Sequence, residues 1–363
     1  MKILILSNSD SGLYQFRKEL IERLTIDNEV MCSVPNADGF LEKLEKLGCK
    51  CINTEFERRS KNPFKDLKLL RTYRKLIRQY NPDAVLTYTI KPNVYGGIAC
   101  RMEKKPYLAN ITGLGTAIEN GGLLGRLSLA LYRIGLKKAE CVFFQNENNK
   151  LFFEKMGITG KYMRLIPGSG VNIKTHSLEP YPADDEVFRF LFVGRVMKDK
   201  GIGELLEAVV AVKAQNKCIF LDVVGGCDEA YQDLLEEYEN KGFLKYHGKQ
   251  EDVHPFYKNA HCVVLPTYHE GMANVLLEAS SVGRPVIATR VPGCREIFDE
   301  ELTGFGCEAG DAQSLVTAMK RMSDLSWNER RTMGLSAHDK VAREFDRNIV
   351  VNAYIEQLNV ISH

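Results

Sequence analysis

The stretch Tyr-His-Glu-Gly-Met-Ala-Asn-Val-Leu-Leu-Glu-Ala at residues 268–279 decides the fold. A short apolar run that ends at Pro266 precedes it and is typical of a buried strand. Beyond Glu270 the apolar positions fall at helical spacing, at Val275, Leu276 and Ala279. We therefore expect a strand, a loop that contains Glu270, and a helix that contains Glu278. A helix start beside the carboxyl end of a parallel strand favours an anionic or hydroxyl-rich ligand, because its first N–H groups are unpaired.

A second unit of strand, loop and helix lies upstream and contains two cations. The apolar run 188–193 predicts a strand that ends in Gly194-Arg195, and a helix is expected over 202–212, just after Lys200. The positive end of a helix dipole disfavours cations, so their presence here indicates an anionic ligand more than a solvated surface. The other elements expected in this half are strands at 220–224 and 284–289, a turn and helix start at 291–296, and helices at 311–322 and 341–358.

The first half of the chain alternates apolar strands with helical segments, which predicts a parallel sheet covered by helices on both faces. It opens with a strand at 2–7, a turn that contains Gly12, and a helix over 13–24. No G-x-G-x-x-G motif follows the first strand, so a dinucleotide site is not expected there. The fold class is therefore α/β with Rossmann-like domains. The remaining strands of this half are expected at 30–34, 49–54, 84–87, 107–111 and 141–145.

Length and composition favour a soluble protein of two domains. The 363 residues exceed the usual size of a single core, and 44% hydrophobic with 26% charged residues is ordinary for a globular chain. No apolar run reaches the roughly 20 residues of a membrane helix, and the first run is too short for a signal peptide. The ten cysteines form no C-x-x-C pair and have no His partner at metal spacing. We expect a cytoplasmic protein with reduced thiols and no metal site.

Charge is distributed unevenly along the chain. Residues 1–170 hold 28 Lys and Arg against 17 Asp and Glu, whereas residues 171–363 hold 21 against 30. Two stretches of the basic half, 58–78 and 123–138, interleave Lys and Arg with large apolar residues. Solvated helices packed on a sheet would explain each stretch alone, and contact with an anionic membrane surface would explain both. Nucleic acid is not expected, because there is no zinc module, RNP-type motif or helix-turn-helix pattern.

The two glutamates, with seven residues between them, resemble the E-x7-E signature of the retaining glycosyltransferases of family 4. The spacing alone is a weak signal, and the resemblance depends on further motifs in family order. Gly194-Arg195 with Lys200-Gly201 resembles the diphosphate site of that family, and 245–253 resembles the loop that holds the base. The resemblance implies the GT-B fold, in which two Rossmann-like domains face a cleft. The implied domains are 1–170 for the acceptor, 171–345 for the nucleotide-sugar, and 346–363 as a C-terminal helix that crosses back to the first domain.

The resemblance also implies roles for the residues of the donor site. Glu270 contacts sugar hydroxyls, while Arg195 and Lys200 hold the diphosphate, whose charge grows as the glycosidic bond breaks. These three are the candidate catalytic residues, and Glu278 binds the ribose hydroxyls. The implied donor is a UDP-sugar, and no metal or other cofactor is obligatory because fixed cations take the place of a metal. The remaining implied donor contacts are Gly12, Gln250, Val253, Gly271, Met272, Ala273, Asn274 and Val275.

The acceptor is expected on the first domain, in contact with Arg58, Arg59, Lys91, Thr112 and Gly113. Many members of the family have a histidine where this chain has Thr112-Gly113, which leaves open what touches the sugar from this side. Lys91 follows the strand at 84–87, where it either holds a phosphate or is a surface lysine.

The motifs at 268–278 and 88–93 look like those of bacterial undecaprenyl-diphosphate-linked N-acetylgalactosaminyltransferases, which assemble N-glycans or surface polysaccharides. The implied reaction moves a hexose or N-acetylhexosamine, with N-acetylgalactosamine as the first choice, to a polyprenyl-diphosphate-linked sugar. Such an enzyme would be peripheral on the inner face of the cell membrane. Two alternatives stay open, a UDP-N-acetylglucosamine 2-epimerase-like enzyme on the same fold and a non-catalytic membrane-docking scaffold subunit. The set of glutamates and cations in family order favours transfer over both.

Overall fold

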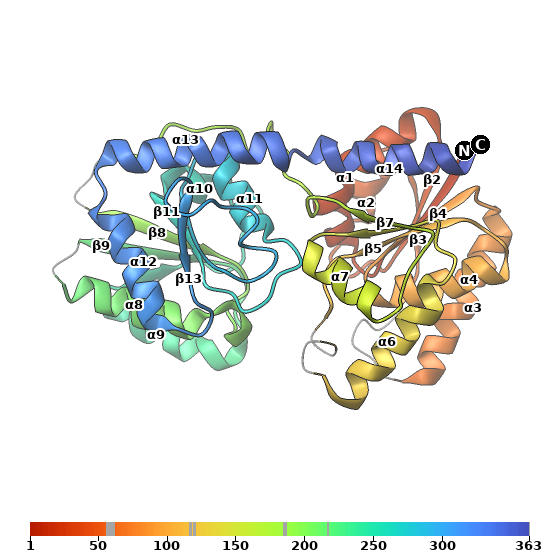
Figure 1. Cartoon of the computed structure of the whole chain (residues 1–363), viewed down its shortest axis with the longest axis horizontal. Helices are drawn as coiled ribbons and strands as arrows, with labels where there is room; N and C mark the ends of the chain where they lie inside the picture. Colours follow the sequence, from red (N-terminus) through yellow and green to blue (C-terminus); the bar gives the residue numbers. More distant parts are fainter. Residues whose placement is uncertain (56–61, 116–117, 119–120, 184–186, 216–217, 363) are drawn as a thin grey trace. The chain divides into compact units, whose positions relative to one another are not determined.

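The chain forms two compact units. The computed structural model describes residues 1–55, 62–115, 118, 121–183, 187–215 and 218–362. Unit 1 comprises Met1–Ser169 together with Arg347–His363, and unit 2 comprises Gly170–Asp346. Each unit is a parallel sheet with helices on both faces, as the alternation of strands and helices predicts (Figure 1).

The sheet of unit 1 has seven parallel strands in the order β3-β2-β1-β4-β5-β6-β7. The direction in which strands are added reverses between β1 and β4, and such a reversal opens a crevice at the carboxyl ends of the strands. The edge strand β7 is not predicted from the sequence, because its half-exposed residues include no apolar run. The strands are β1 (Lys2–Leu6), β2 (Glu29–Val34), β3 (Lys50–Asn53), β4 (Ala84–Tyr88), β5 (Tyr107–Ile111), β6 (Cys141–Phe144) and β7 (Tyr162–Leu165).

Helices pack against this sheet and form two separate apolar clusters with it. One cluster contains residues of α1 (Asp10–Asp27) and α14 (Arg347–Ser362), which lie against each other (Figure 1). The other contains residues of α3 (Pro63–Tyr80), α4 (Gly97–Met102) and α6 (Gly122–Leu136). The remaining helices of unit 1 are α2 (Leu41–Glu45), the π-helical turn η1 (Pro92–Gly96) and α7 (Glu147–Lys155).

The first helix begins earlier than the sequence pattern suggests. It starts at Asp10 instead of Leu13, because the Ser9 hydroxyl accepts the N–H of Gly12 at 3.0 Å and caps the helix. A Cβ on Gly12 would lie 3.1 Å from that hydroxyl oxygen, so a small residue suits this first turn. The expected turn around Gly12 is therefore already helical.

Unit 2 contains six parallel strands in the order β10-β9-β8-β11-β12-β13, with a reversal between β8 and β11. The strands are β8 (Phe188–Val193), β9 (Ile219–Val224), β10 (Leu244–Tyr246), β11 (Cys262–Leu265), β12 (Val286–Thr289) and β13 (Gly304–Cys307). The helices are η2 (Lys198–Lys200), α8 (Ile202–Lys213), η3 (Glu229–Tyr231), α9 (Gln232–Asn240), α10 (His254–Asn259), α11 (Asn274–Ser281), α12 (Ala312–Asp324) and α13 (Trp327–Glu344).

Two expectations for this half are wrong. Residues 291–296 form turns and no helix. The helix expected over 341–358 is two helices, because α13 ends at Glu344 and α14 begins at Arg347. The break occurs where the carbonyl of Phe345 accepts the N–H of Val171 at 2.9 Å, which draws the chain out of the helix.

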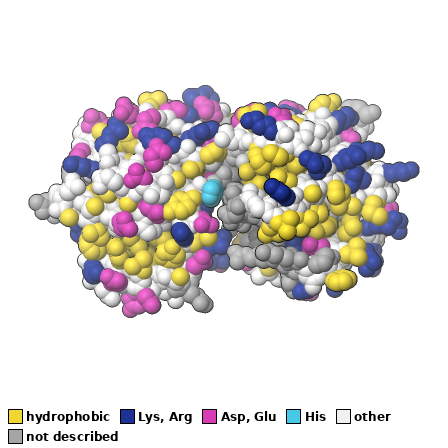
Figure 2. All heavy atoms as spheres, turned by 60° about the horizontal axis from the view of Figure 1, so that its bottom comes forward, with side chains coloured by type: hydrophobic (Ala, Val, Ile, Leu, Met, Phe, Trp, Pro, Cys, Tyr) yellow, Lys and Arg dark blue, Asp and Glu magenta, His cyan; other side chains and the backbone are white. Residues whose placement is uncertain are grey.

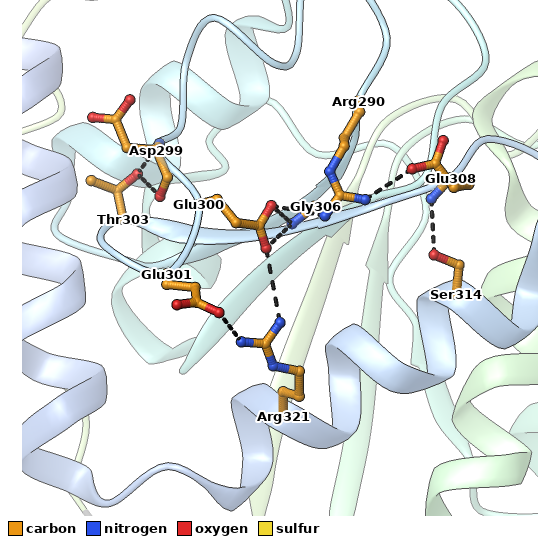
Figure 3. A network of polar contacts seen from close by, with 9 residues as sticks. All are labelled: Arg290, Asp299, Glu300, Glu301, Thr303, Gly306, Glu308, Ser314 and Arg321. Carbon is orange, nitrogen blue, oxygen red and sulfur yellow. Dashed lines mark hydrogen bonds and ion pairs between the residues drawn. The ribbon is translucent and has the colours of Figure 1, made fainter.

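Ion pairs connect the edge of the unit 2 sheet to its surroundings (Figure 3). Arg290, just after β12, lies 2.9 Å from both Glu300 and Glu308, and Arg321 on α12 lies 2.5 Å from Glu301. All of these side chains are substantially exposed. Each pair therefore contributes less than about 1 kcal/mol, and the network positions the edge strand without forming a site.

Candidate active site

Lys200 and Glu270 form an ion pair at the carboxyl edge of the unit 2 sheet. Lys200 ends η2 after β8, and Glu270 lies in the loop after β11. The two loops meet because β8 and β11 are parallel neighbours in the sheet. The Lys200 side chain is 24% exposed and that of Glu270 is 17% exposed. Each charge thus neutralises the other in the free protein, and both remain accessible to a ligand.

Gly201 explains why the two loops lie so close. Its φ is +68°, and a Cβ on it would lie 2.0 Å from the carbonyl oxygen of Pro266, so only glycine fits. The carbonyl of Asp199 accepts the N–H of Tyr268 at 2.9 Å and the hydroxyl of Thr267 at 3.2 Å. The loop that contains the lysine is therefore fixed directly on the loop that contains its partner.

Glu278 lies on α11 and is positioned by a chain of buried contacts. It accepts a hydrogen bond from the Tyr257 hydroxyl at 2.8 Å. Burial, and then the neighbouring carboxylate, raises the pKa of Tyr257 well above its usual value, so the hydroxyl remains a donor. Arg284 is fully buried and donates to the carbonyls of Tyr257, Pro180 and Lys258 at 2.9, 2.7 and 3.0 Å. Burial lowers the pKa of Arg284 to about 10.

Core packing and a contact with Gly293 fix the backbone between the two glutamates. The side chains of Met272 and Ala273 are buried in the core, so only their backbone is available to a ligand. The N–H of Ala273 donates to the carbonyl of Gly293 at 2.8 Å. Gly293 has φ +87°, and a Cβ there would lie 2.6 Å from the carbonyl oxygen of Glu270. This close approach places the turn at 291–296 directly against the loop of Glu270 and Gly271.

The other predicted donor contacts differ in exposure. Arg195 follows β8 and is exposed, while Gln250 is exposed and donates to the carbonyl of His247 at 2.5 Å. Val253 and Val275 pack partly against the core of unit 2. The side-chain oxygen of Asn274 is buried and has no hydrogen-bond partner among the described residues. Contact of these side chains with a nucleotide stays a prediction.

The predicted acceptor residues of unit 1 fall in two hollows. Thr112 lines one of about 220 Å³ together with Gly12, a predicted donor contact, and Gly113 follows Thr112 in the loop after β5. Lys91 lines the other, of about 360 Å³, and its Nζ lies 2.8 Å from the carboxylate of Asp66. A phosphate at Lys91 would therefore compete with an existing ion pair. Arg58 and Arg59 lie outside the described residues.

Three residues of the candidate site were not predicted from the sequence: Tyr257, Arg284 and Gly293. The Pro-Gly pair at 292–293 marks a tight turn and was the available signal for Gly293. No local pattern marks Tyr257 as the partner of a glutamate 21 positions away.

In the part of the chain that the structure describes, no group of three or more His, Cys, Asp or Glu could hold a metal ion. Within the same ranges, no helix combines the length and the apolar character needed to cross a bilayer.

Two family models match the chain, one in each unit. Residues 174–339 match the model described as glycosyl transferases group 1, and residues 2–146 match the model described as glycosyl transferase 4-like. The first match contains the Lys200–Glu270 ion pair and Glu278.

Curated relatives and solved structures cover the chain more fully. The chain is 28% identical to the N,N'-diacetylbacillosaminyl-diphospho-undecaprenol alpha-1,3-N-acetylgalactosaminyltransferase of Campylobacter jejuni, over 98% of each chain. It is 27% identical to the UDP-Gal:alpha-D-GlcNAc-diphosphoundecaprenol alpha-1,3-galactosyltransferase of Escherichia coli, over 72% of this chain and 71% of that one. Anabaena HepE in complex with UDP and glucose has a TM-score of 0.79 at 18% identity, over 99% of this chain and 100% of that one. The sucrose-phosphate synthase of Thermosynechococcus elongatus has a TM-score of 0.79 at 21% identity, over 99% and 98%. These structures share the fold.

Proposed function

The chain belongs to the glycosyltransferases with the GT-B fold, and we propose that it transfers a sugar from a UDP-sugar to a polyprenyl-diphosphate-linked sugar with retention of configuration. The ion pair of Lys200 and Glu270, followed on α11 by the Tyr257-supported Glu278, is the observation that carries this proposal. A lysine paired with one carboxylate suits a diphosphate next to sugar hydroxyls, and a second carboxylate on the following helix suits further hydroxyl groups. Both relatives named above act on diphospho-undecaprenol-linked acceptors by their names, which supports the acceptor class.

In the proposed mechanism, Lys200 exchanges Glu270 for the donor diphosphate when the substrate binds. The lysine then stabilises the charge that grows on the leaving phosphate as the bond to the sugar breaks. The freed Glu270 accepts hydrogen bonds from sugar hydroxyls, and the exposed Arg195 adds a second, bidentate donor to the phosphates. The acceptor hydroxyl attacks from the face of the departing phosphate and gives that phosphate its proton, so no protein base is required.

The transferred sugar is proposed to be N-acetylgalactosamine, on the strength of the Campylobacter relative. The name of the Escherichia relative gives galactose as its sugar, which differs from N-acetylgalactosamine in lacking the N-acetyl group. Transfer assays with UDP-N-acetylgalactosamine, UDP-N-acetylglucosamine, UDP-galactose and UDP-glucose, each with a lipid-diphosphate-linked acceptor, test the choice. Preference for UDP-N-acetylgalactosamine supports N-acetylgalactosamine as the transferred sugar, and preference for another donor would contradict that choice. Epimerised free sugar, formed without an acceptor, would contradict transfer as the activity.

Unit 1 is proposed to bind the inner face of the cell membrane through the apolar residues of α3 and α6, which we call the α3–α6 face. On α6, Leu123 is 85% exposed and Leu127 is 55% exposed, and on α3 Phe64 is 81% exposed. Figure 2 shows hydrophobic side chains gathered on unit 1 with Lys and Arg around them. Exposed apolar side chains within a basic surface suit the headgroup region of an anionic leaflet. A lipid-linked acceptor would be reached from this position.

Sedimentation with vesicles tests the membrane proposal. The protein should sediment with vesicles of phosphatidylglycerol and phosphatidylcholine at low salt, and much less with phosphatidylcholine alone. The double variant Leu123→Gln with Leu127→Gln should lose most of this binding. Leu302→Gln is the matched control, because Leu302 is an exposed leucine of unit 2, whereas the α3–α6 face belongs to unit 1. Equal sedimentation of all three proteins would contradict the assignment of this face.

A further inference from the structure

A buried arginine lines the 220 Å³ hollow of unit 1. The hollow lies where the strand order reverses, because its lining comes from the ends of β1, β4 and β5 and from the first turns of α1. Arg17, on the second turn of α1, is only 4% exposed. It is the single charged residue in the described lining, which is otherwise made of uncharged polar and apolar residues.

Among the described residues, the charge of Arg17 has no acidic partner. Its Nη1 donates to the carbonyl of Phe16 at 2.6 Å, and its guanidinium carbon lies 5.0 Å from the centre of the Tyr88 ring. Its Nε is buried without a hydrogen-bond partner among the described residues. Asp10, on the same helix, is engaged elsewhere, since it accepts the N–H groups of residues 38 and 40.

The rim of the hollow also contains strained backbone. Thr89 follows β4 with φ +72°, a region that β-branched residues rarely adopt. Its hydroxyl is buried and has no partner among the described residues. Such strain persists where the surrounding structure enforces it, and it gathers at ligand sites. A hydroxyl and a guanidinium, both with unused donors, thus lie around one hollow.

From these observations we propose that the hollow binds a phosphate group of a substrate, with Arg17 as its counter-charge. Burying an arginine without an anion costs free energy that a bound anion recovers. The planar guanidinium matches two phosphate oxygens, whereas a lysine would not. The proposal rests on the proposed function, which supplies two sources of phosphate: the lipid-linked diphosphate of the acceptor and the diphosphate of the donor.

The full-length variant Arg17→Met tests the proposal, with Arg23→Met as the control on the same helix. Arg23 is exposed and paired with Asp27 at 2.9 Å, so its loss removes a surface arginine only. Removal of an uncompensated buried charge should leave the melting temperature of the ligand-free protein unchanged or raised. The affinity of Arg17→Met for a phosphate-bearing probe should fall by about tenfold or more, the effect of losing a charge-assisted hydrogen bond. Arg17→Lys should restore part of it.

Farnesyl diphosphate and UDP serve as probes for the two sources, and calorimetry measures both affinities. Loss of farnesyl diphosphate binding with UDP binding kept assigns the hollow to the acceptor, and loss of UDP binding assigns it to the donor. If Arg17→Met melts lower and binds both probes as the wild type does, Arg17 is a structural residue and the proposal is overturned. A wild type that binds no UDP would remove the proposed function instead, so the two failures are distinguishable.

Discussion

Replacing Gly201 by alanine should separate the loop of Lys200 from the loop of Glu270. Gly201 has φ +68°, and an added Cβ would lie 2.0 Å from the carbonyl oxygen of Pro266. Ordinary van der Waals contact begins at 3.4 Å, so the loops must move apart by about 1.4 Å at this point. Lys200 is the neighbour of Gly201, and Glu270 follows Pro266 by four residues, so the movement should reach both partners of the ion pair.

The structure sets the size of the expected effect. An alanine in the left-handed region costs about 1–2 kcal/mol, and overpacking of a closed contact costs about 1–3 kcal/mol more. The free energy of unfolding should therefore fall by about 2–5 kcal/mol. A misplacement of about 1 Å in a positioning group lowers activity about 100-fold, so kcat/KM should fall to about that extent in the fraction that is folded.

Gly203→Ala is the control, two residues further along and inside α8. A Cβ on Gly203 would meet nothing within 4 Å, and alanine is the better helix former by about 0.5–1 kcal/mol. The assay follows UDP release from the UDP-sugar in the presence of a lipid-linked acceptor, together with urea unfolding of each variant. Equal turnover of the two alanine variants would refute the reasoning that Gly201 fixes the site.

Three further predictions concern the site, the first residue of α1 and the metal. Tyr257→Phe removes the hydrogen bond to Glu278 and should weaken UDP-sugar binding about tenfold by calorimetry, whereas Tyr107→Phe, which loses a buried hydrogen bond in unit 1, should not. Burial raises the pKa of Asp10, but N–H donors of the loop at 38–40 outweigh it and hold that pKa below its usual value. A carboxylate whose pKa is lower in the folded than in the unfolded protein stabilises the fold at every pH above its unfolded-state pKa. This stabilisation is lost as the pH falls through the folded-state pKa. Asp10→Asn should thus lower the free energy of unfolding by about 1.5–3 kcal/mol at neutral pH, and urea titrations should show the gap to the wild type closing below about pH 4; a constant gap would contradict this. Finally, EDTA should leave transfer unchanged because fixed cations act on the diphosphate, and loss of activity that Mg²⁺ restores would contradict that.

The sequence was most informative where a single local pattern decides the structure. Apolar runs located the two strands that precede Lys200 and Glu270, and parallel pairing then implies that their carboxyl ends meet. The edge strand β7 escaped notice because partly exposed strands show no apolar run. Ser9 was a recognisable helix cap in hindsight, since Ser followed by a helical pattern is a start signal.

Long-range contacts were beyond the reach of local patterns. The support of Glu278 by Tyr257, and of Tyr257 by Arg284, joins Tyr257 to residues 21 and 27 positions later in the chain. Arg17 was not singled out by any local pattern, since its burial against Tyr88 depends on how α1 packs in the folded unit. Pairing of Lys91 with Asp66 likewise depends on how α3 lies on the sheet.

The affinity of UDP for wild type and for Lys200→Met, measured by calorimetry on the full chain, tests the central claim most directly. The account holds that Lys200 leaves Glu270 to bind the donor diphosphate. Loss of a hydrogen bond to a charged group costs about 1.5–3 kcal/mol, so the dissociation constant should rise by about 10- to 150-fold. An unchanged dissociation constant, with the variant folded, would contradict the assignment of the diphosphate site.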